Sequence, residues 1–282
     1  MLLIADSGST KTSWVLTDGK KSRSGYNTIG YNPLFMNTEE IYQSLSESLI
    51  PKLNNAAVKK IFFYGADCST PSNITIVQKA LSRCFSKATI YIEHDMLAAA
   101  RALLGNSPGF AAIIGTGSNT CIYDGNKIEQ NISPLGYLLG DEGSGSYIGK
   151  RILRDLMRGY MPYQLEKKFN HTYHLSPAEI FDFMYNQPSP NRFLASFCKF
   201  ADTNKSHPYI KKVVMESFSD LFENLVNHYP GYENYSFNCV GSVGSIFKDL
   251  LKEVVLSRKM KMGKVIASPI EDLVRYHMKN ND

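Results

Sequence analysis

A turn near the N-terminus gathers the residue types that bind phosphate through a divalent cation. It lies between two apolar segments and reads Asp6-Ser-Gly-Ser-Thr-Lys-Thr12. Gly8 lets the backbone approach a ligand, and successive backbone N–H groups in a tight turn form an anion-binding concavity. A phosphate beside Asp6 would be repelled unless a cation such as Mg²⁺ lay between them. On its own the segment fits a metal–phosphate turn and an ordinary polar hairpin equally well.

A second segment repeats this pattern when the sequence is shifted by 109 positions. The repeat is Ala112–Tyr123, in which Gly117 falls on Gly8 and Ser118 falls on Ser9. Gly115 then takes the place of Asp6, so only the first copy keeps the acid. Self-similarity of this kind indicates duplicated domains, each offering one phosphate-facing hairpin to a shared cleft.

An acidic residue follows a predicted strand at Glu93-His94-Asp95, directly before an alanine-rich helix predicted over Met96–Leu104. Ligands of open α/β sheets gather at the carboxyl ends of strands, so Asp95 is a candidate for chemistry. An acid at a helix N-terminus is equally typical of a helix cap. His94 is more typical of local packing or pairing.

Two further glycine-rich segments could hold a polar ligand. Ser133–Gly149 contains five glycines beside Asp141 and Glu142, which suits either a ligand-binding loop or a flexible loop with a capping acid. The turn Gly241–Gly244 joins a predicted strand to a predicted helix, a geometry that lets backbone lie near a ring or a phosphate. Neither G-x-x-x-x-G-K-[ST] nor G-x-G-x-x-G occurs, so a nucleotide site would have to use the paired hairpins.

The elements that would position these residues alternate between strand and helix, which predicts an α/β fold with a mostly parallel sheet. A turn-rich junction at Gly105–Gly109 marks the start of a second domain. We expect turn-rich connections over 20–33 and a helix beginning near Thr38, which would cap it. The aromatic-rich segment 159–222 is expected to be helical in pieces broken by proline, and 258–264 to be a solvated helix end with its exit loop.

Composition excludes several classes of protein. The 282 residues are 43% hydrophobic and 20% charged, with a net charge of +5, which is typical of a globular protein long enough for two domains. We expect no nucleic-acid or membrane partner. The five cysteines form neither a C-x-x-C pair nor a Cys/His cluster, so a disulfide framework and a zinc site are not expected. Met1 leads directly into the first predicted strand, from which we expect no signal peptide and a cytoplasmic location.

Four motifs in order along the chain resemble the N-acetylglucosamine kinase group, which belongs with the BadF/BadG-type ATPases in the actin/hexokinase/Hsp70 superfamily. The resemblance spans nearly the whole chain. The motifs are Asp6–Thr12, Gly115–Asn119, Gly140-Asp-Glu-Gly-Ser144 and Val240–Gly244.

The resemblance implies two ribonuclease-H-like domains around a central nucleotide and sugar cleft. These would be residues 1–107, with the C-terminal helix 268–282 packed back on them, and residues 108–267. It implies an ATP-dependent sugar kinase in which Asp95 is the general base and Asp6 acts through Mg²⁺. The residues that would hold the nucleotide are Asp6, Gly8, Ser9, Thr10, Lys11, Thr12, Gly115, Thr116, Gly117, Ser118, Gly241, Ser242 and Gly244. Those that would contact the sugar are Asn32, Asn119, Gly136 and Asp141.

The acceptor sugar stays open between N-acetylglucosamine, glucosamine and N-acetylmuramic acid, because two segments depart from the family pattern. They are Pro134-Leu135, where some relatives place an aromatic ring, and Gly65–Ser69, which aligns poorly. A homodimer is implied by the resemblance alone.

Two other functions remain as alternatives to a sugar kinase: an ATPase that activates a dehydratase, and a catalytically silent sugar or nucleotide sensor.

Overall fold

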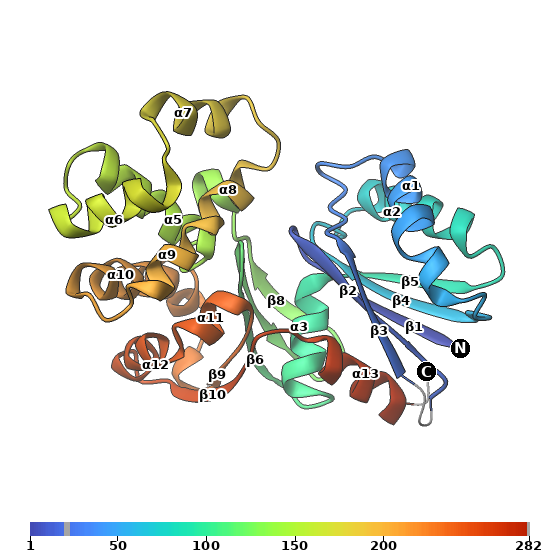
Figure 1. Cartoon of the computed structure of the whole chain (residues 1–282). Helices are drawn as coiled ribbons and strands as arrows, with labels where there is room; N and C mark the ends of the chain where they lie inside the picture. The colour runs from blue at the N-terminus through green and yellow to red at the C-terminus, as the bar shows by residue number, and fades with distance from the viewer. Residues whose placement is uncertain (20–22, 281–282) are drawn as a thin grey trace. The chain divides into compact units, whose positions relative to one another are not determined.

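The computed structural model describes residues 1–19 and 23–280, and the chain divides into two compact units (Figure 1). Unit 1 consists of Met1–Pro108, Gly125–Ile128 and Ser268–Asp282, and unit 2 of Gly109–Asp124 and Glu129–Ala267. The short segment Gly125–Ile128 therefore lies in unit 1, although the boundary drawn from the sequence placed it in the second domain.

The sheet of unit 1 contains five strands among the described residues, in the order β3-β2-β1-β4-β5. The strands are β1 (Leu2–Ser7), β2 (Lys11–Thr17), β3 (Arg23–Ile29), β4 (Lys60–Gly65) and β5 (Thr89–His94). The first three form an antiparallel meander, whereas β1, β4 and β5 are parallel. The carboxyl ends of β1, β4 and β5 therefore meet at one edge of the sheet.

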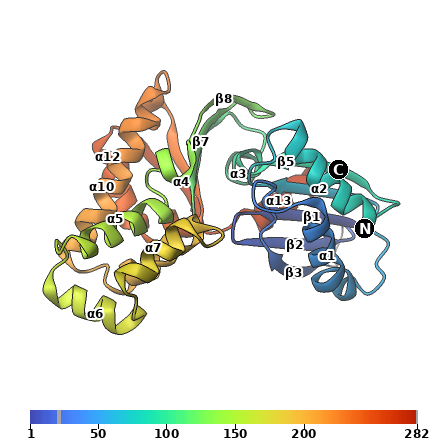
Figure 2. The same cartoon turned by 90° about the horizontal axis from the view of Figure 1, so that it is seen from above.

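Helices cover both faces of this sheet, as Figures 1 and 2 show. They are α1 (Thr38–Ser48), η1 (Ile50–Leu53), α2 (Pro71–Cys84), α3 (Asp95–Leu104) and α13 (Ile270–Lys279). Strand alternation decides which side chain meets which helix. Ile61 and Phe63 on β4 belong to the core shared with α1 and α2. Phe62 and Tyr64, which alternate with them, contact His277 of α13.

Unit 2 repeats the sheet of unit 1, with the order β10-β9-β6-β7-β8 among its described residues. Its strands are β6 (Gly109–Ile114), β7 (Ser118–Tyr123), β8 (Ile128–Ile132), β9 (Ser236–Val240) and β10 (Lys261–Ile266). Strands β6 and β7 are antiparallel, and β6, β9 and β10 are parallel. The duplication expected from the two hairpins thus extends to all five strand positions.

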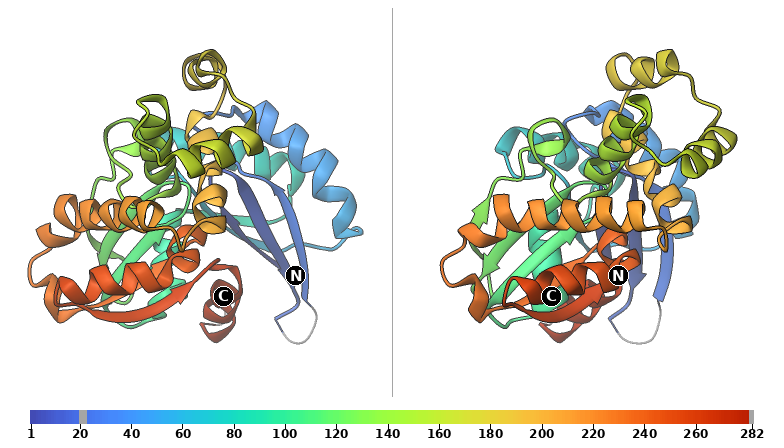
Figure 3. Two further views of the ribbon diagram at one scale, coloured as in Figure 1. Left: turned by 60° about the vertical axis from the view of Figure 1, so that its left-hand side comes forward. Right: turned by 90° about the vertical axis from the view of Figure 1, so that its left-hand side faces the viewer.

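Unit 2 carries most of the helices of the chain, and Figure 3 shows α10 and α12 packed alongside its sheet. Its core joins Phe110 and Ile114 of β6 to Ile148 of α5, Phe222 of α10 and Leu251 of α12. The helices are α4 (Gly136–Leu139), α5 (Gly145–Met157), α6 (Tyr163–Tyr173), α7 (Pro177–Tyr185), α8 (Pro190–Ser196), α9 (Cys198–Thr203), α10 (Pro208–Asn224), η2 (Val226–His228), η3 (Tyr232–Asn234), α11 (Ser242–Ile246) and α12 (Lys248–Ser257).

Three sequence-based expectations are wrong. The connection expected over 20–33 contains strand β3, and the basic segment expected to be a helix end contains strand β10. Both are edge strands with few buried side chains, so neither shows a strong hydrophobic alternation. Helix α1 is capped by Asn37 rather than Thr38, because the Asn37 side chain accepts hydrogen bonds from the backbone of Glu39 and Glu40.

Among the described residues, no helix is both long enough and apolar enough to cross a bilayer.

The attachment of α13 to unit 1 provides a test of this fold. Arg101 Nη1 donates to Tyr64 Oη over 2.7 Å, and Tyr64 Oη lies 2.8 Å from His277 Nε2, so one hydroxyl links α3, β4 and α13. We expect Tyr64→Phe to lower the free energy of unfolding by about 1–3 kcal/mol, because it removes the hydroxyl that accepts from Arg101 and bonds the buried His277. Tyr91→Phe is the matched control and should change it by less than about 0.5 kcal/mol, since the Tyr91 side chain is exposed. Urea unfolding monitored by circular dichroism measures both, and equal effects would contradict the assignment.

Candidate functional site

The turn between β1 and β2 has the compact form expected of an anion-binding loop. The Gly8 N–H donates to Lys11 O over 3.0 Å, which closes the turn. Gly30, just after β3, packs against it: a Cβ on Gly30 would lie 2.2 Å from Gly8 O and 2.7 Å from Ser9 C. Gly30 thus packs directly against the turn, and any side chain at this position would overlap the turn backbone.

The residues of this turn face two ways. Ser9, Thr10 and Lys11 keep solvent exposure. The Thr12 hydroxyl is buried, where it bonds Ser7 Oγ at 2.8 Å and donates to Ile29 O at 2.9 Å. Thr12 therefore braces the hairpin from inside.

The corresponding turn of unit 2 is one residue shorter than that of unit 1. Ser7 pairs with Thr12 at the end of the first hairpin, and Ile114 pairs with Ser118 at the end of the second. The Gly115 N–H donates to Gly117 O, as the Gly8 N–H does to Lys11 O. Gly115 therefore corresponds to Gly8 and not to Asp6, so the constant shift of 109 positions is wrong. A constant shift cannot follow two turns of different length.

Two other glycine-rich segments of unit 2 meet at this second turn. The Gly145 N–H at the start of α5 donates to Gly115 O, and the Ser146 N–H donates to Thr116 O. Gly241 has φ +134°, and a Cβ there would lie 2.2 Å from Ile114 O. The segment that holds Gly241, Ser242 and Gly244 thus begins in direct contact with the strand that leads into the Gly115–Ser118 turn.

Asp141 lies beneath the same turn. Its backbone is in the left-handed region, with φ 57°, and its buried carboxylate accepts a hydrogen bond from the Ser118 N–H at 3.2 Å. A Cβ on Gly117 would lie 3.0 Å from Asp141 Oδ2. Asp141 therefore contacts the Gly115–Ser118 turn directly. Ser118 Oγ is also buried, and it has no hydrogen-bond partner within the described chain.

In unit 1, three neighbouring parallel strands each end at a carboxylate: Asp6 on β1, Asp67 after β4 and Asp95 after β5. Asp95 is the first residue of α3, whose N-cap is His94, so it is not the helix cap. Burial, followed by the negative charges of Asp67 and Asp6, raises the pKa of Asp95 to about 7. Burial also raises the pKa of Asp6 to about 7, although the Lys11 ammonium opposes the shift.

Asp67 is a candidate that the sequence reasoning missed. Asn32 is almost fully buried, and its Nδ2 donates to Asp67 Oδ2 over 2.6 Å while its Oδ1 accepts from the Leu34 N–H. The residue follows a predicted strand as Asp95 does, and that common position was the available signal. Its left-handed backbone, with φ 59°, turns the carboxylate toward Asn32 in a way that no sequence pattern indicated.

Asn119, on β7, is held by hydrogen bonds within unit 2. The Thr120 N–H donates to Asn119 Oδ1 over 2.9 Å, and Asn131 Nδ2 donates to the same oxygen over 2.8 Å. Gly136 begins the short helix α4, and a Cβ there would meet nothing within 4 Å. Of the four residues expected to contact a sugar, Gly136 is thus the one with open space around it.

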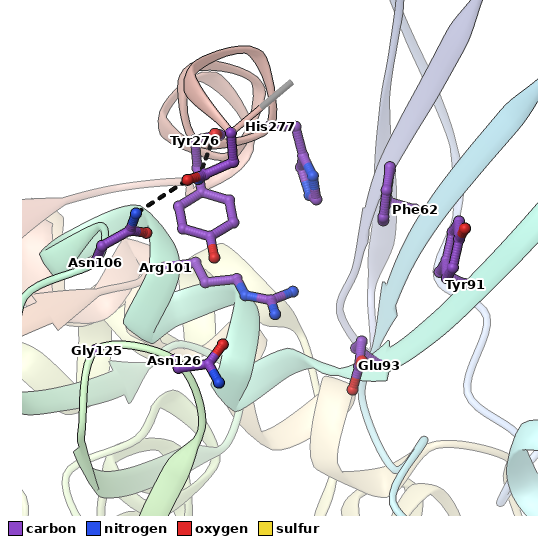
Figure 4. A pocket seen from close by; sticks show the side chains of 10 residues that line it. Phe62, Tyr91, Glu93, Arg101, Asn106, Gly125, Asn126, Tyr276 and His277 are labelled. Atoms are coloured by element: carbon purple, nitrogen blue, oxygen red, sulfur yellow. Dashed lines mark hydrogen bonds between the residues drawn. The ribbon is translucent and has the colours of Figure 1, made fainter. Parts of the chain in front are cut away.

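A separate pocket of about 510 Å³ lies in unit 1 and contains none of the expected site residues. Figure 4 shows Arg101 reaching into it from α3, with Phe62 and Tyr91 on the strands across from it. The Arg101 guanidinium lies 5.2 Å from the centre of the Tyr276 ring and donates to Tyr64. These contacts fix the helix whose first residue is Asp95.

The described residues contain no group of three or more His, Cys, Asp or Glu side chains that could hold a metal ion by themselves. Asp6 could therefore hold Mg²⁺ only together with other ligands, such as phosphate oxygens and water.

Comparison with known proteins gives matches among solved structures, whereas no family model and no curated protein matches the chain. A presumed N-acetylglucosamine kinase from Porphyromonas gingivalis is 38% identical, with 100% of both chains covered and a TM-score of 0.95. A presumed N-acetylglucosamine kinase from Chromobacterium violaceum is 15% identical over 98% of each chain, with a TM-score of 0.75. A ROK family glucokinase from Streptomyces griseus, in complex with glucose and AMPPNP, is 15% identical over 98% of this chain and 97% of its own, with a TM-score of 0.59.

The last two similarities show the fold alone, and they confirm the expected two-domain α/β architecture of actin-like sugar kinases. The first shows the family, because its identity extends over the full length of both chains. The chain belongs to the N-acetylglucosamine kinase family of actin-like sugar kinases.

Proposed function

We propose that this protein transfers the γ-phosphoryl group of ATP to a hydroxyl of an amino sugar, most naturally N-acetylglucosamine, with Asp95 as the general base. The observation that carries the proposal is the environment of Asp95 at the carboxyl end of β5. Its pKa of about 7 matches the requirement that a general base be poised near the working pH. Asp95 would accept the proton of the attacking hydroxyl, and the resemblance to the family implies that Asn32 and Asn119 contact the sugar.

The residues of both turns fit a nucleotide and its metal. The Lys11 ammonium compensates only partly for the burial of the Asp6 carboxylate, so the pKa of Asp6 stays raised, and a bound cation would supply further compensation. Mg²⁺, when bound, would neutralise the charge that develops on the phosphates. The unsatisfied Ser118 Oγ would donate to a phosphate oxygen.

Asp141 would connect the sugar and the phosphates. Its carboxylate accepts a hydrogen bond from the Ser118 N–H, and the resemblance to the family implies that it also contacts the sugar. A residue that contacts both would align the acceptor hydroxyl with the γ-phosphorus, and alignment is the main demand of phosphoryl transfer.

The activity itself is tested by comparing ADP release from ATP with and without N-acetylglucosamine, glucosamine or N-acetylmuramic acid. A kinase releases ADP only with its acceptor sugar. ADP release that is independent of sugar would instead support a dehydratase-activating ATPase, and absence of turnover would support a sensor.

We expect Asp95→Asn to lower kcat by about 10²- to 10⁴-fold, because the acceptor of the hydroxyl proton is removed. ATP affinity should stay within about twofold. Near-normal turnover of this variant would contradict the assignment of the base.

The same variant should be more stable than the wild type at alkaline pH. The folded-state pKa of Asp95, about 7, lies above the unfolded value of 3.8, so its stability contribution is present below about pH 4 and is lost as the pH rises through 7. Asparagine removes that loss. We expect the free energy of unfolding at pH 8 to rise by about 1–3 kcal/mol and the gain to vanish near pH 4, as measured by urea titration at each pH. A gain that did not depend on pH would contradict the raised pKa.

Asp67→Asn should separate electrostatics from chemistry. Removing its charge lowers the pKa of Asp95, so the acid limb of the pH profile of kcat/KM should move to lower pH. The KM for sugar should rise, since Asn32 loses a charged partner. Asp249→Asn, which removes one exposed carboxylate from α12, is the control and should leave the profile in place.

Gly30→Ala should weaken ATP binding. The added Cβ would force Gly8 and Ser9 to move, so the KM for ATP should rise at least about tenfold and the free energy of unfolding should fall by about 1–3 kcal/mol. Gly25→Ala lies on the same strand segment, and its Cβ would be 3.9 Å from the nearest atom, so it should behave like the wild type. Equal KM values for the two variants would show that the turn does not bind ATP.

A further inference from the structure

We propose that Asn131 on β8 is a positioning residue that fixes the orientation of the Asn119 amide, so that Asn119 offers only N–H donors to the sugar. This inference rests on the proposed function, because it concerns the sugar contact of that same site. Neither the sequence motifs nor the family resemblance assigned any role to Asn131.

The orientation of both amides follows from backbone groups whose chemistry is unambiguous. The Thr120 N–H can only donate, so the atom of Asn119 that it contacts at 2.9 Å is the oxygen. Thr120 O can only accept, so the atom of Asn131 that it contacts at 2.6 Å is the nitrogen. The remaining contact, Asn131 Nδ2 to Asn119 Oδ1 at 2.8 Å, is therefore a donor facing an acceptor. Rotating either amide by half a turn would set two donors or two acceptors against each other.

These hydrogen bonds occupy the Asn119 oxygen and leave its two N–H groups to donate to a ligand. Both lone pairs of Oδ1 are occupied, and Nδ2 has no hydrogen-bond partner in the part of the chain that the structure describes. The side chain is half-buried and Nδ2 is not among the fully buried unsatisfied atoms, so its N–H groups are accessible to a bound acceptor. We therefore expect Asn119 Nδ2 to donate a hydrogen bond to an oxygen atom of the sugar.

The strands do not need Asn131 to stay in register. The hydroxyl of the buried Tyr229 accepts from the Ile132 N–H at 2.9 Å and donates to Thr120 O at 2.8 Å, which joins β7 to β8 one residue away. Asn131 itself is exposed. A role confined to holding the sheet together would therefore be redundant.

The first hairpin offers an internal comparison. Ser13 occupies the position of Asn119 in the ladder, and it pairs across the strands with Asn27. There the hydroxyl donates to the oxygen of the amide, over 3.3 Å, and no second amide is oriented. The arrangement in which one asparagine orients another belongs to unit 2, the unit with the Asn119 contact.

The test is steady-state kinetics of ADP release by the full chain with N-acetylglucosamine, or with whichever of the three amino sugars the wild type uses. In Asn131→Asp a carboxylate replaces the donor to Asn119 Oδ1, and its repulsion of that oxygen moves the Asn119 amide out of its wild-type orientation, against the one remaining hydrogen bond from the Thr120 N–H. We expect the KM for sugar to rise about tenfold, the KM for ATP to stay within twofold and the melting temperature to stay within about 2 °C. Gln130→Glu places the same charge on the adjacent exposed residue and should leave all three values unchanged.

A second readout distinguishes orientation from general damage. Monodeoxy analogues of the sugar, tested one position at a time, should reveal one oxygen whose loss raises the wild-type KM. In Asn131→Asp the ratio of the KM for that deoxy analogue to the KM for the parent sugar should fall to about one, because the substitution and the missing oxygen remove the same interaction. A wild-type KM for sugar in Asn131→Asp, or an unchanged deoxy penalty, would overturn the inference while leaving the kinase assignment intact. A wild-type protein that releases ADP without regard to sugar would overturn the proposed function and this inference with it.

Discussion

The burial and mutual repulsion of carboxylates at the carboxyl ends of the parallel strands β1, β4 and β5 are the constraint on which the rest of unit 1 depends. Asp6 lies near the end of β1, while Asp67 and Asp95 follow β4 and β5, and the charges of Asp6 and Asp67 raise the pKa of Asp95 beyond the effect of burial alone. Such a group is unfavourable for folding, so the surrounding structure has to hold it in place. The Asn32–Asp67 hydrogen bond, the Arg101–Tyr64–His277 chain and the close approach of Gly30 to Gly8 all serve that purpose.

The turn of unit 2 is stabilised in a different way. Its turn has no acid at the position of Asp6, and it is held instead by backbone contacts with two other glycine-rich segments and by the Asp141 carboxylate. Backbone N–H groups carry no net charge to be repelled, and glycine allows several segments to approach one another closely. The duplicated sheet thus supports a charged site in one unit and a mainly backbone site in the other.

The sequence predicted those parts of the protein whose signals are local. Glycine-rich turns, the buried strands and the acid after β5 all have short patterns, and each of these segments lies where the pattern placed it. Edge strands β3 and β10 were missed because their pairing comes from a neighbouring strand rather than from their own hydrophobicity. Asp67 and Asn131 were missed because each gains its role from a partner distant in the chain, Asn32 and Asn119. The wrong shift of 109 positions arose from a turn-length difference that only the strand register reveals.

Helix α13 has a consequence for how the protein is made. Its residues come from the end of the described chain, yet they pack against β1 and α3 from its beginning. During synthesis the first sheet is complete long before this helix exists, so the surface of the sheet and α3 against which Leu273 and Val274 later pack stays uncovered while unit 2 is translated. Folding of unit 1 is therefore complete only after α13 has been synthesised. A nascent chain that pauses before α13 would still expose an apolar surface to chaperones.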